Sequence, residues 1–216
     1  GHPRTGDLLP ALIQLGPAAA CGLHVHSGWG LGEAFADNAF VCAFNLRSVS
    51  RHRLLPQGGT FRVESEPFLT GDSADFHPTD VIEDADGSLL VVDTGGWYKL
   101  CCPTSQLEKP AVTGAIYRVR RRDTPQLSDP RGFRLAWDDV ADDALAARLG
   151  DPRPTVAWRA VEQLAARAAT APLAGVLTDG SFSEAARQRA VWGLARIDGP
   201  DARAAVRTAL GDAAAG

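Results

Sequence analysis

Methionine is absent from the 216 residues, so the chain lacks even an initiator, and it opens on GHPRTGD without a signal-peptide pattern. We therefore expect a piece of a longer polypeptide, with any targeting signal upstream. No apolar run approaches the length needed to cross a bilayer, so no transmembrane segment is predicted. No Cys-x-x-Cys-His motif occurs, so no c-type haem is expected to attach within this chain.

A concentrated basic face is also missing. The formal net charge is −4, which argues against a nucleic-acid partner. The basic cluster of the chain comprises Arg118, Arg120, Arg121 and Arg122. Two of these residues alternate along an expected strand, so the cluster is either a solvated strand end or a site for an anionic partner.

The segment from Asp75 to Gly96 predicts a β-hairpin. Apolar and β-branched residues fill 79–83 and 88–93, and Asp86-Gly87 supplies the positive φ of a tight turn. A further strand is expected at 115–120. Upstream, strands are expected at 21–26, 39–44, 47–55 and 60–69, the last two pairing across Pro56-Gln57-Gly58-Gly59. The apolar run 8–15 could add one more. This series predicts about two antiparallel propeller blades in residues 1–122.

Helical periods replace strands after a linker at 123–138, in which 133–137 could form one outer strand. The first helix is expected at 138–149. Arg159-Ala160-Val161 then recurs as Arg189-Ala190-Val191, an offset of 30 residues, and each copy is followed by a second helix, near 173–177 and 202–210. Helix pairs at this period predict a HEAT-like solenoid over 139–216, with Trp158 and Trp192 in its core.

The amino-acid sequence of this hairpin is specific enough to suggest a family. HPTDVIEDADGSLLVVDTGGWYKLCCPTSQL, followed by GAIYRVRRR, resembles the last blade of planctomycete-type membrane-bound dehydrogenase-like proteins. Those proteins join a six-bladed propeller, similar to glucose and sorbosone dehydrogenases, to HEAT-type repeats. The resemblance runs from about Cys21 to the end of the chain. It implies a partial propeller with further blades upstream, a periplasmic or cell-envelope location, and a protein partner on the helical repeats.

On that topology the loops 75–79 and 94–114 meet at the mouth of the propeller. His77 and Asp80 would be the catalytic residues, and Trp97, Tyr98 and Lys99 would hold pyrroloquinoline quinone, with calcium in the full-length protein. A histidine can take the proton of an alcohol as hydride leaves, a lysine can bind quinone oxygens, and an aromatic ring can stack on the quinone. Alternatively, Asp80 ties down a turn and His77 is a structural histidine.

The four cysteines leave their pairing open. A bond between the neighbours Cys101 and Cys102 would be strained; a bond from one of them to Cys21 or Cys42, or free thiols, is the alternative. His24 and His26 share one face of a strand, which makes only two ligands for a metal, so no metal site is predicted.

Two functions remain open at this level. The first is a fragment of a quinoprotein-like sugar or alcohol dehydrogenase, inactive alone, with the helical repeats used for docking. The second is a noncatalytic module in which both parts bind partners. Propellers host both kinds of function, so the expected fold does not choose between them.

Overall fold

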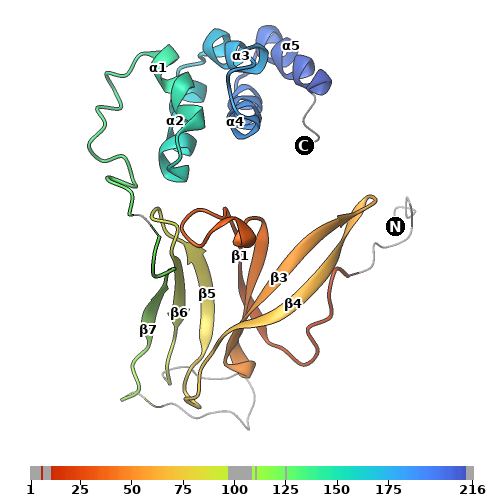
Figure 1. Cartoon of the computed structure of the whole chain (residues 1–216), viewed down its shortest axis with the longest axis vertical. Helices are drawn as coiled ribbons and strands as arrows, with labels where there is room; N and C mark the ends of the chain where they lie inside the picture. Colours follow the sequence, from red (N-terminus) through yellow and green to blue (C-terminus); the bar gives the residue numbers. More distant parts are fainter. Residues whose placement is uncertain (1–5, 7–10, 97–108, 110, 125, 213–216) are drawn as a thin grey trace. The chain divides into compact units, whose positions relative to one another are not determined.

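The computed structural model describes residues 6, 11–96, 109, 111–124 and 126–212 (Figure 1). The chain divides into two compact units, residues 1–125 and residues 126–216. Strands make up the first unit and helices the second. None of the helices within these ranges is both long enough and apolar enough to cross a membrane.

The first unit contains two antiparallel sheets. The four-stranded sheet has the order β1-β2-β3-β4, with bounds Ala20–His26, Asn38–Ala43, Ser48–Gln57 and Thr60–Thr70. The three-stranded sheet has the order β5-β6-β7, with bounds Pro78–Glu83, Leu89–Asp93 and Ala115–Val119. The β3–β4 and β5–β6 hairpins are confirmed, and the latter closes with the Gly87 amide donating to the Asp84 carbonyl at 2.8 Å.

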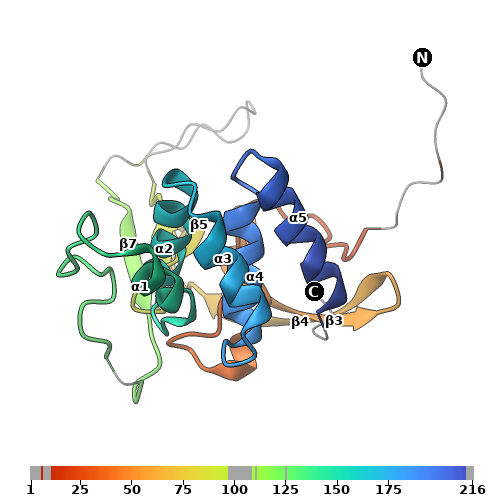
Figure 2. The same cartoon turned by 90° about the horizontal axis from the view of Figure 1, so that it is seen from above.

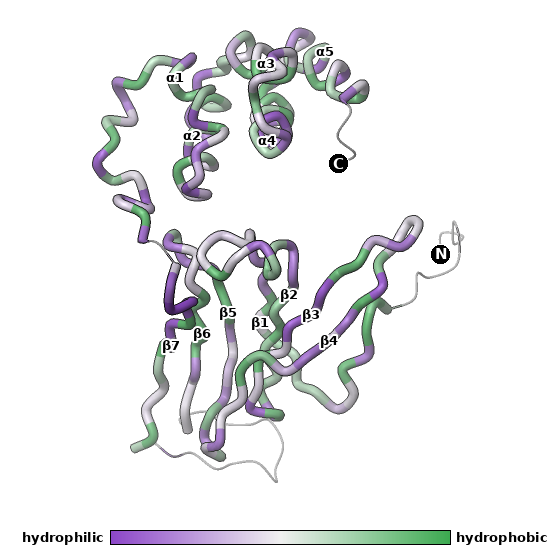
Figure 3. Tube along the Cα trace, in the orientation of Figure 1, coloured by the Kyte–Doolittle hydropathy of each residue, from purple (hydrophilic) through white to green (hydrophobic). Residues whose placement is uncertain are grey.

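One apolar core lies in this unit. β2 is buried along its whole length and contributes Phe40 and Cys42, while the three-stranded sheet contributes Val81, Leu89 and Val91. By contrast, hydrophilic residues recur along β3 and β4 (Figure 3), and much of β4 is exposed. The strand residues of both sheets therefore pack on a shared interior.

β1 and β5 lie side by side without being hydrogen-bonded partners in a sheet (Figure 1). Their closest approach is at Gly22, where an added Cβ would lie 2.4 Å from the Cα of Asp80. Any side chain at position 22 would force the two strands apart. Glycine is the residue that permits so close a backbone approach.

The second unit consists of α1 (Asp142–Ala147), α2 (Pro154–Ala166), α3 (Thr170–Thr178), α4 (Glu184–Leu194) and α5 (Pro200–Thr208). Proline occupies the first turn of α2 and α5, where its missing N–H costs no intrahelical bond. Ser183 caps α4, because its hydroxyl accepts from the Ala186 amide. Viewed from above, α3 and α4 lie between α1 and α2 at one end and α5 at the other (Figure 2).

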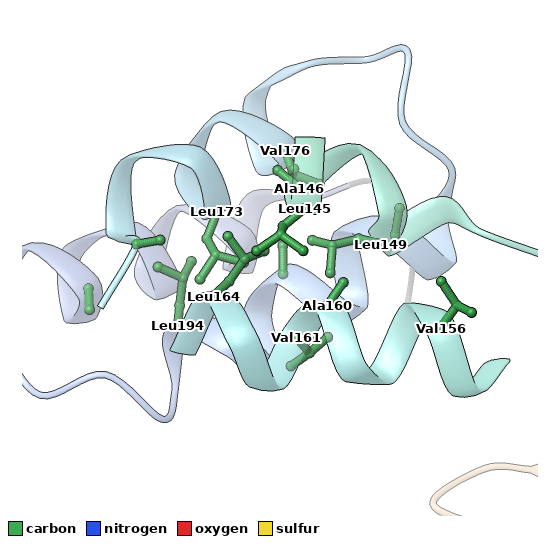
Figure 4. Close-up of a cluster of buried hydrophobic side chains, with 14 of the residues drawn as sticks. Leu145, Ala146, Leu149, Val156, Ala160, Val161, Leu164, Leu173, Val176 and Leu194 are labelled. Atoms are coloured by element: carbon green, nitrogen blue, oxygen red, sulfur yellow. The ribbon is translucent and has the colours of Figure 1, made fainter. Parts of the chain in front are cut away.

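All five helices contribute to one buried cluster (Figure 4). Its members include Leu145 of α1, Leu164 of α2, Leu173 of α3, Leu194 of α4 and Ala202 of α5. α1 also packs on α3, α2 on α4, and α3 on α5. In a solenoid each repeat buries its apolar face only on its neighbours, which differs from a cluster shared by every helix.

The expected fold class is therefore wrong. Throughout the described ranges the strands form two separate sheets of four and three strands, and the helices share one core, so neither a propeller nor a HEAT-like solenoid is evident. The expectation arose from strand and helix spacing, which fixes local elements but not how they close on one another.

Three local expectations also fail. Residues 133–137 form turns instead of a strand, because Asp129 accepts from the Phe133 and Arg134 amides. Trp158 and Trp192 are 41% and 58% exposed, so they are not core residues. Residues 11–15 contain no strand, and 8–10 lie outside the described residues.

Candidate functional site

The start of β5 and the end of β6 bring together a histidine and an aspartate. Pro78 pairs with Asp93 in the register of these strands, so His77 lies beside the turn that follows Asp93. The Asp93 carboxylate is 7% exposed, and its Oδ1 accepts from the His77 amide at 2.8 Å and from the Gly95 amide at 2.9 Å. One buried carboxylate thus fixes the backbone on both sides of the site.

The His77 imidazole is held through one ring nitrogen. Its Nδ1 lies 3.0 Å from the Gly95 carbonyl oxygen, which can only accept, so Nδ1 carries a proton. The Phe44 ring lies against it, with centroids 4.6 Å apart at 31°. A histidine held in this way through one nitrogen is oriented to use the other as a base or a ligand.

Two backbone hydrogen bonds at Gly96, which we call the neck, lie near His77. The Gly96 amide donates to the Val112 carbonyl at 3.0 Å, and the Lys109 amide donates to the Gly96 carbonyl at 2.6 Å. The Lys109 ammonium lies 2.6 Å from Asp75 Oδ1. The backbones of Gly96 and Lys109 are therefore in contact, one residue after the Gly95 carbonyl that lies against His77. Trp97, Tyr98 and Lys99, the expected cofactor contacts, lie outside the described residues.

Asp80, the second expected catalytic residue, has a different setting. Its side chain is exposed, and its Oδ1 accepts from the amide of the next residue, Val81, at 2.9 Å. Across the described part of the chain, no hydrogen bond or ion pair links it to His77. The structure brings His77 to Asp93 and Gly95, and it leaves Asp80 tying down local backbone beside Gly22.

A second polar group, the Glu83 cluster, joins β1 to β5. It comprises Glu83, Ser27, His24 and His26. The Ser27 amide and hydroxyl donate to the two Glu83 oxygens at 2.8 and 2.5 Å, and His24 Nε2 lies 3.6 Å from Oε2. Burial alone would raise the pKa of Glu83, but the two hydrogen bonds from Ser27, together with the neighbouring His24 imidazole, outweigh it and lower the pKa. Glu83 is therefore a carboxylate at neutral pH.

His26 lies fully buried in this cluster. Its Nε2 donates to the Gly87 carbonyl at 3.1 Å, and its Nδ1 accepts from the Gly28 amide at 2.8 Å. Burial lowers the pKa of His26, so the ring is neutral. Both nitrogens are engaged, and among the described residues no group of three or more histidine, cysteine, aspartate or glutamate side chains could hold a metal ion.

Cys21 and Cys42 are free thiols. Cys21 Sγ donates to the Pro78 carbonyl at 3.3 Å. Burial, together with Cys21 and Asp80, raises the pKa of the Cys42 thiol to about 12. Cys42 is thus protonated and unreactive at neutral pH. Cys101 and Cys102 lie outside the described residues, so the bond between them stays a hypothesis.

Three residues of these sites were not recognised from the sequence. Asp93 had a usable signal, since an aspartate two residues before a glycine at a strand end is typical of an Asx turn. Phe44 and Glu83 had none, because their partners lie 33 and 56 positions away along the chain.

Comparisons with known proteins place the strand-rich part of the chain in a family. Neither the curated proteins nor the solved structures include a match to this chain. The family described as "Domain of unknown function (DUF7133)" matches residues 16–123, half of the chain. The matched range contains His77, Asp93 and the whole Glu83 cluster, so both polar sites belong to the shared domain. On this match, the chain belongs to the DUF7133 family.

Proposed function

We propose that this domain contributes a proton-accepting histidine to an oxidoreductase that dehydrogenates a sugar or another alcohol. The single observation behind the proposal is the fixed orientation of the His77 ring. Its Nδ1–H is committed to the Gly95 carbonyl, and its backbone is held by the buried Asp93. That arrangement supplies a base at Nε2 whose orientation does not depend on substrate.

In the proposed reaction the alcohol carbon loses a hydride while the hydroxyl proton moves to His77 Nε2. The pair of electrons thus leaves carbon with the hydride, and a carbonyl product remains. Bound pyrroloquinoline quinone would supply the hydride acceptor. Burial of His77, which is 7% exposed, keeps bulk water from competing for its proton.

The quinone part of the proposal depends on Trp97, Tyr98 and Lys99. These three residues lie outside the described residues, so the support for the quinone is the resemblance of the hairpin sequence. The described residues do not make a calcium site by themselves, and no step of the reaction is assigned to calcium. The resemblance to planctomycete-type dehydrogenase-like proteins supports an extracytoplasmic location and a protein partner for the helical unit.

A second candidate is a noncatalytic interaction module. The observation that favours it is the exposure of apolar side chains on the strands: Leu23 is 60%, Ile82 45% and Ile116 68% exposed. Exposed aliphatic residues on neighbouring strands are typical of a surface that another protein covers.

A dye-reduction assay of the complete polypeptide with pyrroloquinoline quinone and calcium, against a panel of sugars and alcohols, tests the first candidate. His77→Asn is the sharpest variant, because its amide nitrogen can still donate to Gly95 while the base at Nε2 is lost. We expect turnover to fall at least about 100-fold with quinone affinity unchanged. Asp72→Asn, at an exposed aspartate of the same unit, is the matched control.

The outcomes separate the two candidates. Quinone-dependent turnover that collapses in His77→Asn supports the oxidoreductase. Turnover that survives this variant removes His77 from the chemistry. Absence of both turnover and quinone binding leaves the interaction module as the better function.

A further inference from the structure

A cavity of about 380 Å³ lies in the first unit, and none of its lining residues belongs to the His77 site or to the Glu83 cluster. Its walls include Leu31, Phe35, Phe68 and Val119, and two arginines, Arg120 and Arg121, line it as well. Val119 pairs with Leu89, whereas Ala115 pairs with Asp93 beside His77. The cavity is therefore at the opposite end of the β5-β6-β7 sheet from His77.

We propose that this cavity binds a small amphipathic carboxylate, with its apolar body on the phenylalanine wall and its carboxylate at Arg120 and Arg121. The inference does not depend on the oxidoreductase function. Its basis is the combination of a fixed apolar wall with two cations that the described structure leaves uncompensated.

The apolar wall is an extension of the core. The Phe68 ring contacts Phe40, which is fully buried, with centroids 4.7 Å apart, and it meets Phe35 edge-on at 6.3 Å. Arg51 covers the Phe35 ring at 4.1 Å. Leu31 is only 5% exposed. These contacts hold the aromatic rings in place before any ligand arrives, which lowers the entropic cost of binding.

The guanidinium groups of the cavity are not paired with acidic side chains. Arg51, Arg53, Arg62 and Arg118 each pair with a carboxylate of the same unit. The side chains of Arg120 and Arg121 make no hydrogen bond or ion pair with any described residue. Glu33 is the single acidic residue in the lining, so the cavity has a positive net charge.

The Arg121 guanidinium lies against the turn at Gly32. Gly32 has φ 105°, and an added Cβ there would lie 2.9 Å from Arg121 Nη1. A side chain at position 32 would be strained and would displace the guanidinium. Thr124 Oγ1 donates to the Gly30 carbonyl at 2.6 Å, which fastens the chain after Arg121 to the same turn.

These features define the class of ligand. Guanidinium groups bind carboxylates through paired hydrogen bonds, and the rings offer an apolar surface for the rest of the molecule. A volume of about 380 Å³ is at the small end of ligand pockets, which suits a one- or two-ring acid and excludes a polymer.

The test uses naphthalene-2-carboxylate as the probe and naphthalen-2-ylmethanol as its uncharged analogue, with binding followed by calorimetry. We expect the carboxylate to bind at least about tenfold more tightly than the alcohol. The double variant Arg120→Gln/Arg121→Gln should weaken carboxylate binding at least about tenfold and leave alcohol binding unchanged. Arg122→Gln, an unpaired neighbour outside the lining, is the matched control and should stay within about twofold.

Two results would overturn the proposal. Equal affinity for the carboxylate and the alcohol would show that the arginines do not recognise charge. An Arg122→Gln loss as large as that of the double variant would show general surface attraction instead of a site. Phe35→Leu, which keeps an apolar wall but removes the ring, should weaken both probes, and an unchanged affinity for both would place binding elsewhere.

Discussion

Replacement of Asp93 by alanine is the most direct test of how the His77 site is held. The substitution removes the one acceptor shared by the His77 and Gly95 amides. Because Asp93 is 7% exposed, water reaches the vacated amides poorly. The turn after β6 should therefore loosen, and the His77 ring should lose its fixed orientation toward the Gly95 carbonyl.

The magnitude follows from the two bonds. A hydrogen bond to a charged group contributes about 1.5–3 kcal/mol, and an unsatisfied buried donor costs a similar amount. Loss of both bonds should therefore lower the free energy of unfolding of the first unit by about 3–6 kcal/mol. Asp93→Asn keeps a neutral acceptor at the same place, so it should cost only about 1–2 kcal/mol. Asp72→Ala, at an exposed aspartate, is the control.

Urea unfolding combined with amide hydrogen exchange measures both effects. The His77 and Gly95 amides should lose protection in Asp93→Ala much more than the Val81 amide, whose acceptor is Asp80. The reasoning is refuted if Asp93→Asn destabilises as much as Asp93→Ala, or if Asp93→Ala behaves like the Asp72→Ala control.

Four further predictions concern titration, packing and reactivity. The folded-state pKa of His26 lies below its unfolded value, so stability should fall as pH drops below about 6.5, and His26→Gln should remove that dependence. The folded-state pKa of Glu83 is also lowered, so its contribution is complete above about pH 4.3 and lost as pH falls further; Glu83→Gln should converge with the wild type there in urea titrations. Leu164→Ala, at a fully buried position, should cost about 3 kcal/mol in the helical unit, whereas Leu210→Ala, at an 87% exposed position, should stay within about 0.5 kcal/mol. Iodoacetamide at pH 8 should leave Cys42 unmodified in the folded protein by intact mass, and rapid labelling of Cys42 would contradict its burial.

Local structure was predictable because its signals are local. The Asp84–Gly87 turn and the strand patterns on either side of it each act within a few residues. The strands of both sheets and the repeated helices appear close to where periodicity places them. Periodicity does not show how strands and helices pack together into a larger fold. The propeller and solenoid predictions were wrong for that reason.

Only part of the candidate site could be predicted from the sequence, for the same reason. His77 was recognised from its chemistry, but its orientation comes from Gly95 and Phe44, whose positions depend on tertiary packing. Trp158 and Trp192 show that a helical pattern does not decide which side chains are buried. Each lies in a helical pattern, yet the stripe that faces the core consists of leucine, valine and alanine, and the larger rings remain at the surface.

The neck joins Gly96 to Lys109, two residues that are far apart along the chain. Bringing two such residues together costs chain entropy, but each doubling of the number of residues between them adds only about 0.6 kcal/mol. We therefore expect that a short peptide epitope could be inserted between Gly96 and Lys109 at little cost to the stability of the first unit.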